Sequence, residues 1–257
     1  FEQGSVFHLQ GELVDPAQLS ACADMLMTTS PNVLIYAGMD GWRRQMVERG
    51  HELLDAALQL GAGLRREIEE IEGLHVLRDE FLGVQASHDL DPLHVVIDVS
   101  GLGINGYTAA DWLRSEQRID TGMSDHRRIE ATLSMADDEQ TGKRLLDALH
   151  ALAAAAGSLP AAKIVKMPDE QDLELEPAML PREAFFAAKE AIDFSAAAGR
   201  IAAEQVTPYP PGIPVVLPGE RITTALIEYL RSGLAAGMVT PDPADPSLHT
   251  IRVVVER

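Results

Sequence analysis

Apolar positions in the first third of the chain repeat with the period of an α-helix. Between residues 46 and 71 they recur every three or four positions, and Gly73 interrupts the pattern. The positions concerned are Met46, Gly50, Leu53, Ala57, Gly61, Leu64, Ile68 and Ile71. This spacing predicts a helix of about seven turns with one apolar stripe. We expect a helix of this length to act as a spine between two lobes.

Three local signals precede this helix. A short apolar run at Val6–Leu9 predicts a buried strand. The pair Asp15-Pro16 predicts the start of a helix, because Asp is a strong N-cap residue and Pro suits the first helical position. The pair Ser30-Pro31 gives a similar signal, so a further helix is expected to open at Val33.

The pattern changes after residue 74. Apolar runs that predict strands lie at residues 75–77, 95–99 and 129–135. The run at 95–99 is nearly continuous, which is typical of a strand in the middle of a sheet. Thr108 with Asp111 resembles a capping box at a helix start, and Asp137-Asp138 places negative charge at the start of another helix. Residues 74–156 are therefore predicted to form a compact α/β lobe.

The composition changes again between residues 157 and 180, where proline and acidic residues gather. Such a stretch predicts a linker or a long surface crossing. Beyond it, Pro181 predicts a helix, residues 222–234 a longer helix and residues 251–255 a final strand. The fold class expected from the whole pattern is α/β.

Composition limits the partners of the chain. Its 257 residues suffice for one large domain or two modest ones, at roughly 150 residues each. It carries 21 Lys and Arg against 40 Asp and Glu, for a net charge of −19. This charge repels phosphate backbones, so we expect no nucleic-acid partner, whereas a small cationic substrate is compatible with it.

Several sites and locations are disfavoured. The single Cys22 cannot form an intrachain disulfide, and the eight His residues are scattered without the spacing of a metal site. Neither Ser100 nor Ser232 lies in the G-x-S-x-G turn of a serine hydrolase. No apolar run approaches the roughly 20 residues that span a bilayer, and there is no signal-peptide pattern, so we expect a cytoplasmic protein without membrane contact. Because the chain begins with Phe1, we expect polypeptide ahead of it.

Two segments are candidates for phosphate binding. Hydroxyl side chains lie at Thr28, Thr29 and Ser30, just before a predicted helix, whose N-terminus is a natural anion site. An ordinary Ser N-cap remains the alternative. Residues 101–106 match G-x-G-x-x-G after a strand and before a helix, as in a dinucleotide site. No apolar strand leads to an acidic residue at the expected distance, which favours a plain strand-to-helix turn.

The densest local signal is proline-rich. Residues 207–214 contain four prolines, which forbid helix and give a stiff, extended path. This stiffness could hold Tyr209 and Glu220 beside a pocket. The alternatives are a structural crossing and a polyproline ligand, and the apolar residues at 213 and 215–217 favour the packed crossing.

The same segment resembles a known family. TPYPPGIPVVLPGERI at residues 207–222 is similar to the C-terminal signature of the bacterial ornithine/lysine/arginine decarboxylases. These are pyridoxal-phosphate enzymes with the aspartate-aminotransferase type of fold. Further resemblances lie at Thr28–Pro31, Asp91–Ile97, Gly103–Asp111, Pro181–Phe186 and Gly199–Glu204.

The resemblance implies a domain organisation. The chain would then be the C-terminal portion of a fold-type-I pyridoxal-phosphate enzyme. Residues 1–45 are then the end of the large, cofactor-binding domain, and residues 46–156 are the spine helix and the small α/β domain. Residues 157–180 are an acidic linker, and residues 181–257 are a C-terminal decarboxylase domain of α+β type.

The resemblance also implies a reaction, in which a basic amino acid (arginine, lysine or ornithine) loses CO2 to give a diamine or polyamine. The family's Schiff-base lysine lies in an S-x-H-K stretch just before a glutamine that resembles Gln3, so it is expected ahead of Phe1. The lysines present resemble no such stretch; they are Lys143, Lys163, Lys166 and Lys189. We therefore expect no catalytic residue in this chain, and no decarboxylation by the chain alone.

Binding roles follow from the resemblance as well. In the family the active site lies at a dimer interface, and the T-S-P segment reaches the cofactor phosphate of the neighbouring subunit. Thr28 and Ser30 are thus expected to contact pyridoxal phosphate in a homo-oligomer that is at least a dimer. Glu220 is a hypothesis for binding the cationic side chain of the substrate, with a plain helix-start acid as the alternative. The N-terminal half is expected in the same product or as a separate partner chain.

Two positions depart from the family pattern. His94 stands where the family has a basic residue after Asp-Pro, and Gly122 stands where it has a glutamate. These departures affect the expected substrate more than the expected fold. A catalytically silent subunit or scaffold of the same fold is the alternative function. An aminotransferase is a third, although no arginine motif for a substrate carboxylate can be assigned.

Overall fold

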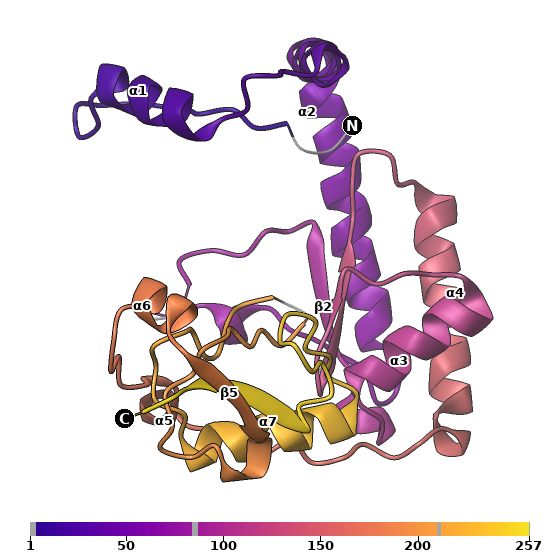
Figure 1. Cartoon of the computed structure of the whole chain (residues 1–257). Helices are drawn as coiled ribbons and strands as arrows, with labels where there is room; N and C mark the ends of the chain where they lie inside the picture. Colours follow the sequence, from indigo (N-terminus) through magenta and orange to yellow (C-terminus); the bar gives the residue numbers. More distant parts are fainter. Residues whose placement is uncertain (1–3, 84–86, 210–211, 257) are drawn as a thin grey trace. The chain divides into compact units, whose positions relative to one another are not determined.

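The computed structural model describes residues 4–83, 87–209 and 212–256. Gln3, Pro210 and Pro211, which the sequence analysis used, lie outside these residues. The chain divides into two compact units, Phe1–Ala56 and Ala57–Arg257 (Figure 1). Each unit is described by itself.

The first unit contains helix α1 (Pro16–Leu26) and the first part of helix α2 (Val33–Glu69). The predicted start of α1 is confirmed, because the Asp15 carboxylate accepts a hydrogen bond from the backbone N–H of Ala17 and Pro16 occupies the first turn. The helix expected at Val33 and the spine helix expected at 46–71 are a single helix of 37 residues.

Two predictions for this unit are wrong. Residues Val6–Leu9 form no strand, and their side chains are exposed. A strand needs a hydrogen-bonding neighbour, and no strand lies among the described residues of this unit. The expected N-cap at Ser30 is also absent. Asn32 caps α2 instead, since its side chain accepts from the N–H of Leu34 at 2.9 Å.

The second unit contains the later turns of α2, followed by a four-stranded sheet in the order β1-β2-β4-β3, in which every pairing is antiparallel. The strands are β1 (His75–Val76), β2 (His94–Asp98), β3 (Met123–Ser124) and β4 (Arg128–Thr132). The predicted mid-sheet position of β2 is confirmed, because it is hydrogen-bonded to β1 on one side and β4 on the other.

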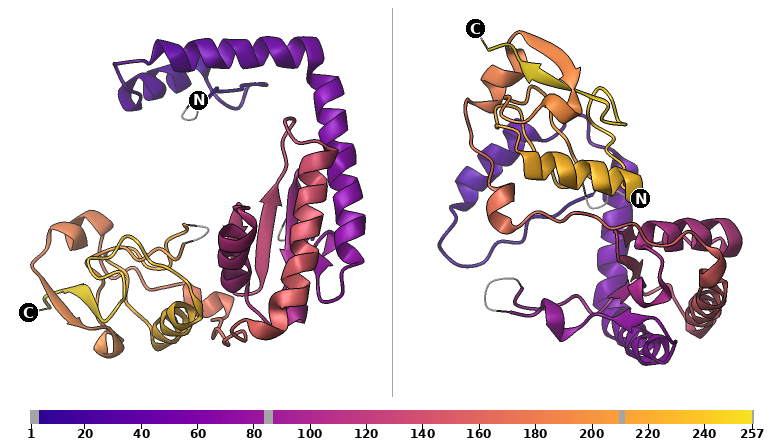
Figure 2. Two further views of the ribbon diagram at one scale, coloured as in Figure 1. Left: turned by 90° about the vertical axis from the view of Figure 1, so that its right-hand side faces the viewer. Right: turned by 90° about the horizontal axis from the view of Figure 1, so that it is seen from below.

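Helices complete this layer: α3 (Gly106–Trp112), continued by a π-helical turn (Leu113–Gln117), and α4 (Glu139–Ala155). Figure 2 shows the sheet beside α4 and the later turns of α2. A single core joins them, in which Ile68, Ile97, Leu113 and Leu149 are fully buried. Short 3₁₀ turns lie at Asp79–Phe81, Ser100–Leu102 and Ala156–Ser158.

The glycine-rich segment at 101–106 is a turn between β2 and α3. Gly103 takes a positive φ of 75°, and the backbone of Gly106 lies so close to the carbonyl of Arg128 that a Cβ would collide with it. The antiparallel sheet lacks the parallel βαβ unit of a dinucleotide site. The segment is therefore a plain strand-to-helix turn.

The two helix starts expected in this lobe have different outcomes. Asp138 caps α4 through a capping box with Thr141, which confirms the prediction of an acidic start. The cap of α3 is Asn105 rather than Thr108, since the Asn105 side chain accepts from the N–H of Thr108 at 2.7 Å. The predicted capping box of Thr108 and Asp111 is therefore wrong.

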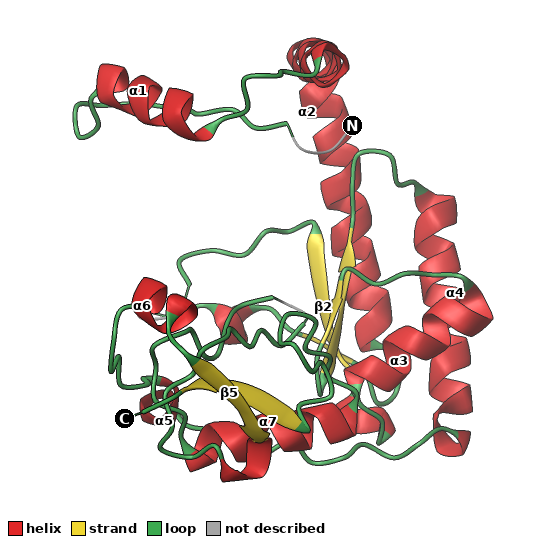
Figure 3. Ribbon diagram, in the orientation of Figure 1, coloured by secondary structure: helices red, strands yellow, loops and turns green. Residues whose placement is uncertain are grey.

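The rest of the unit folds around a second core. Its elements are α5 (Glu170–Leu173), α6 (Pro181–Phe186), β5 (Lys189–Asp193), the 3₁₀ turn Phe194–Ala196, α7 (Thr224–Ala236) and β6 (Thr250–Val254). The helix at Pro181, the longer helix and the final strand are confirmed, whereas β5, which pairs with β6, was not expected. Phe194, Val206, Ile222, Leu226 and Val253 are buried in this core. Figure 3 shows the two-stranded sheet beside α7.

Candidate functional site

The loop between α1 and α2 exposes the hydroxyl groups predicted to bind phosphate. Thr28 and Ser30 are both exposed. The Thr28 Oγ1 accepts a hydrogen bond from the Ser30 N–H at 3.1 Å, so its own proton remains available to donate. Because Asn32 caps α2, neither hydroxyl is used to satisfy the first turn of that helix. The loop therefore offers two donors for an anion.

Glu220 lies in the second unit and is half-buried. Its Oε2 accepts a hydrogen bond from the backbone N–H of Leu217 at 2.7 Å. The backbone N–H of Glu220 in turn donates to the Leu217 oxygen, so the two bonds together close a turn. Glu220 precedes Thr223, the N-cap of α7, so it lies outside the first turn of that helix. One carboxylate oxygen already has a structural partner.

The proline-rich segment leading to Glu220 is packed in part. Val206 and Val216 form an antiparallel bridge, and Val216 is buried, whereas Ile213 is 67% exposed. The backbone N–H of Tyr209 donates to the oxygen of Val239, and its side chain is exposed. No hydrogen bond among the described residues joins Tyr209 to Glu220.

Sequence reasoning missed a hydrogen-bonded pair formed by a buried acid and an exposed histidine. Glu130 on β4 is only 4% exposed, and its Oε1 lies 2.9 Å from the Nδ1 of His94 on β2. The Thr132 hydroxyl donates to the same carboxylate at 2.9 Å. The other ring nitrogen of His94 lies 3.7 Å from Asp91. The two residues are diagonal neighbours across the strands, since His94 lies opposite Thr132 and Glu130 lies opposite Val96. The sequence alone does not supply this register, so it could not reveal the pair.

Gly122 lies against this pair, and its environment explains the departure noted in the sequence. Its backbone N–H donates to the oxygen of Glu130 at 2.8 Å. A Cβ at this position would collide with the Glu130 carboxylate and would lie 2.9 Å from the Thr132 hydroxyl. Position 122 therefore has no room for a side chain while Glu130 is bonded to His94.

A second histidine is held by two carboxylates at the end of α2. His75 bonds Glu69 through Nδ1 at 2.8 Å and Glu80 through Nε2 at 2.7 Å. These hydrogen bonds raise the pKa of His75 above its usual value. The pKa values of its two partners are lowered. For Glu69 the main cause is a hydrogen bond from the backbone N–H of Val76. For Glu80, whose pKa falls to about 2, the main cause is a hydrogen bond from the backbone N–H of Arg78.

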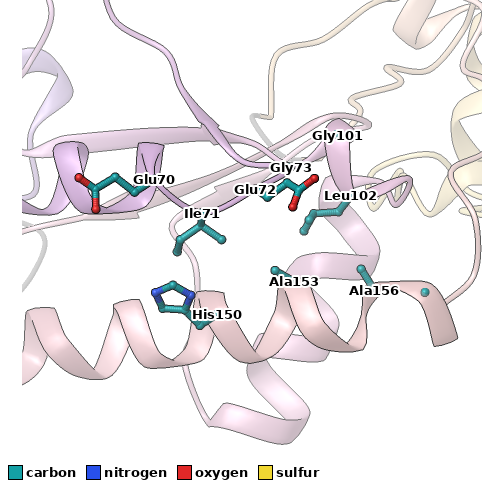
Figure 4. Close-up of a pocket in the computed structure, with 10 residues that line it drawn as sticks. Glu70, Ile71, Glu72, Gly73, Gly101, Leu102, His150, Ala153 and Ala156 are labelled. Carbon is teal, nitrogen blue, oxygen red and sulfur yellow. The ribbon is translucent and has the colours of Figure 1, made fainter.

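A pocket of about 530 Å³ opens between the end of α2, the turn after β2 and α4. Figure 4 shows Ile71 facing His150 across it, while the carboxylates of Glu70 and Glu72 lie on opposite sides of Ile71. The acidic groups do not converge on one point, so this pocket lacks the arrangement of an acid–base pair. Within residues 4–83, 87–209 and 212–256, no cluster of His, Cys, Asp and Glu could hold a metal ion.

None of the helices in the described part of the chain combines the length and the apolar character needed to cross a membrane.

Comparisons with known structures define the fold. The lysine decarboxylase LdcF of Francisella novicida superposes with a TM-score of 0.75 at 18% identity, over 96% of this chain and 46% of its own. The constitutive lysine decarboxylase of E. coli gives a TM-score of 0.69 at 18% identity, over 96% of this chain and 47% of its own. The chain thus has the α/β fold of about half of a lysine decarboxylase chain.

Sequence comparisons point to the same group of enzymes. The profile of the Orn/Lys/Arg decarboxylase C-terminal domain matches residues 164–241. Arginine decarboxylases of Bacillus subtilis and Bacillus anthracis are 34% and 35% identical over 99% of this chain, which covers 52% and 51% of their length. Residues 164–241 thus match the C-terminal domain of the Orn/Lys/Arg decarboxylases, and the chain spans about half the length of the curated relatives that it matches.

Proposed function

We propose that this chain is the C-terminal part of a pyridoxal-phosphate-dependent decarboxylase of a basic amino acid. The observation that carries the proposal is the identity of 34–35% to arginine decarboxylases along 99% of the chain. Arginine is therefore the first substrate to test, followed by lysine and ornithine. The net charge of −19 suits a cationic substrate.

The donor groups of the loop before α2 fit the phosphate of the cofactor. Thr28 and Ser30 present exposed hydroxyls that no helix cap consumes. We assign them to the phosphate of pyridoxal phosphate bound by a neighbouring subunit of a homodimer. When bound, the cofactor supplies an electron-accepting ring for the loss of CO2.

The lysines of this chain do not suit covalent attachment of that cofactor. Lys143 pairs with Asp147, Lys166 pairs with Glu228, and the ammonium group of Lys189 lies over the ring of Phe185. These three and Lys163 are all exposed. We infer that the attaching lysine belongs to polypeptide outside this chain, and that the chain alone is inactive.

The assignments of the domains extend the same proposal. Residues 1–45 would complete the cofactor-binding domain, residues 46–156 would be the spine helix and small domain, and residues 181–257 would be the decarboxylase domain beyond the linker at 157–180.

Glu220 is assigned to the cationic end of the substrate through the carboxylate oxygen that does not bond Leu217. We assign this activity to the cytoplasm.

The test compares this chain with the product of the complete reading frame that encodes it. Both are purified, supplied with pyridoxal phosphate, and assayed for CO2 release from arginine, lysine and ornithine. We expect release by the complete product and none by the chain alone. A complete product that binds the cofactor but releases no CO2 would overturn the proposed decarboxylase activity and favour a catalytically silent subunit. Activity of the chain alone would overturn the assignment of the lysine.

A further inference from the structure

A second pocket, of about 450 Å³, lies where α2, the start of β2 and the segment after β1 meet. Its ionisable lining residues come from α2, from the segment after β1, from the turn before β2 and from the first position of β2. They are Arg65, Arg66, Arg78, Asp91 and His94. The remaining lining residues are apolar: Leu58, Ala62, Leu77, Leu90, Pro92 and Val96. The pocket thus joins an apolar wall to a group of guanidinium ions.

Two of the three arginines of this pocket donate to main-chain oxygens rather than to carboxylates. Arg65 donates to the oxygen of His94 at 3.0 Å, and Arg78 donates to the oxygen of Arg65 at 3.4 Å. Within the described part of the chain, none of Arg65, Arg66 and Arg78 has an ion pair within 4.0 Å. This is unexpected in a chain with 40 acidic and 21 basic residues.

The positive charges of Arg65 and Arg78 are close enough to repel each other. Burial lowers the pKa of Arg65 and the neighbouring charge of Arg78 lowers it further, while the more weakly acting carboxylate of Asp91 raises it. Arginine nevertheless stays protonated at neutral pH. An anion in the pocket would relieve this repulsion and would fill hydrogen-bond donors that the main chain leaves free, because each guanidinium has five N–H groups.

Asp91 and His94 define one side of the site. Asp91 lies 3.7 Å from the Nε2 of His94, whose Nδ1 is held by the buried carboxylate of Glu130. The anionic group of a ligand is therefore expected on the arginine side, away from Asp91. The apolar residues suit a hydrocarbon body, and the pocket volume falls within the range of small-molecule sites.

We propose that this pocket binds an organic carboxylate with an apolar body. The carboxylate contacts the guanidinium groups of Arg66 and Arg78, and the hydrocarbon lies against the apolar wall. None of the lining residues is Thr28, Ser30 or Glu220, so the inference does not depend on the proposed decarboxylation.

The test uses 2-naphthoate and its uncharged analogue 2-naphthamide, titrated into the full chain by calorimetry. We expect saturable binding of one naphthoate and at least tenfold weaker binding of the amide, with an affinity that falls as salt is added. Arg66→Ala and Arg78→Gln should each weaken naphthoate binding at least fivefold. Arg66 is exposed and makes no ion pair, so its substitution leaves the fold intact.

Arg182→Ala is the matched control, since Arg182 is an exposed arginine on α6 that does not line the pocket. It should bind naphthoate as the unmodified chain does. Equal affinity for naphthoate and naphthamide would overturn the proposal, because it would indicate adsorption to apolar surface only. Unchanged binding in Arg66→Ala, or an equal loss in Arg182→Ala, would overturn it as well.

Discussion

The side chain of Asn105 donates a hydrogen bond to the main-chain oxygen of Ala236, 2.8 Å away and 131 residues later in the chain. The same side chain caps α3 through the N–H of Thr108. One buried amide therefore starts α3 and holds the last turn of α7. Next to it, Gly237 ends α7 with a φ of 113°, and a Cβ there would lie 3.1 Å from Tyr107. These contacts join the two cores of the second unit.

Replacing this amide should destabilise the second unit strongly. Asn105→Ala leaves the Ala236 oxygen and the Thr108 N–H without partners in a buried site, so we expect a loss of about 2–3 kcal/mol in the free energy of unfolding. Urea denaturation measures it. Asp138→Ala removes an exposed cap from α4 and should lose only about 1 kcal/mol. Equal losses in the two variants would mean that the bond to Ala236 contributes nothing.

The crowding at Gly122 predicts a coupling between two positions. Gly122→Ala forces the Glu130 carboxylate away from His94, which should destabilise the fold by about 1–3 kcal/mol. In the background Glu130→Ala the carboxylate is gone and only the Thr132 hydroxyl, 2.9 Å from the added Cβ, remains close, so the same substitution should cost less. A double-mutant cycle in urea measures this coupling.

Gly63→Ala is the control for this cycle. Gly63 is in α2, and a Cβ there meets nothing within 4 Å. Because Ala favours helix over Gly by about 1 kcal/mol, this substitution should stabilise the chain in either background. Additive losses at positions 122 and 130 would contradict the proposed contact.

The cluster of His75, Glu69 and Glu80 predicts a dependence of stability on pH. The pKa of His75 is raised, so its contribution is complete below its ordinary value of 6.5 and is lost as the pH rises through the raised value. The lowered pKa values of Glu69 and Glu80 act in the opposite sense. Their contribution is present above 4.5 and is lost as the pH falls, for Glu80 towards about 2.

The cluster should therefore stabilise the fold most between these limits. In urea denaturation at pH 6 and pH 8.5, His75→Gln should reduce the stability difference between the two conditions. The change is expected to be small, because the ring is half exposed and solvent screens the charges. His150→Gln, at an exposed position of α4, should leave the difference unchanged. An unaltered profile in His75→Gln would refute the assignment.

Local signals in the sequence predicted the elements well where one residue had one strong partner nearby. Asp15 and Asp138 cap the helices that they were expected to cap. Ser30 and Thr108 failed as caps because an Asn lies within three positions of each, and Asn ranks among the best N-cap residues. In both cases the helix itself was predicted correctly, and the error concerned which of two neighbouring residues caps it.

Features that depend on distant partners could not be predicted. The strand β5 has the sequence Lys-Glu-Ala-Ile-Asp, whose strand character comes from pairing with β6. The pair of His94 and Glu130 exists only because β2 and β4 lie in register. The family was recognisable because its proline-rich signature is contiguous, whereas the assigned roles of Thr28, Ser30 and Glu220 stay predictions.

The loop before α2 allows a test in which neighbouring hydroxyls are compared. In the complete product, Thr28→Ala and Ser30→Ala should each raise the dissociation constant for pyridoxal phosphate by about tenfold or more, because a hydrogen bond to a charged group contributes about 1.5–3 kcal/mol. Thr29→Ala, between them, should change it little. Equilibrium dialysis against the cofactor measures the constant. The same loss in Thr29→Ala would indicate a general effect on the loop.

Glu220 allows the substrate role to be separated from a structural one. In Glu220→Gln the side-chain oxygen can still accept the N–H of Leu217, so the turn before α7 should survive while the negative charge is lost. If the charge binds the cationic end of the substrate, KM should rise by about tenfold with kcat little changed, since a hydrogen bond to a charged group contributes about 1.5–3 kcal/mol.

Glu220→Ala should in addition lower the urea midpoint, because the Leu217 N–H loses its partner. Glu190→Gln, at an exposed position on β5, is the charge-matched control and should leave KM unaltered. A normal KM in Glu220→Gln together with a lowered midpoint in Glu220→Ala would restrict Glu220 to closing its turn.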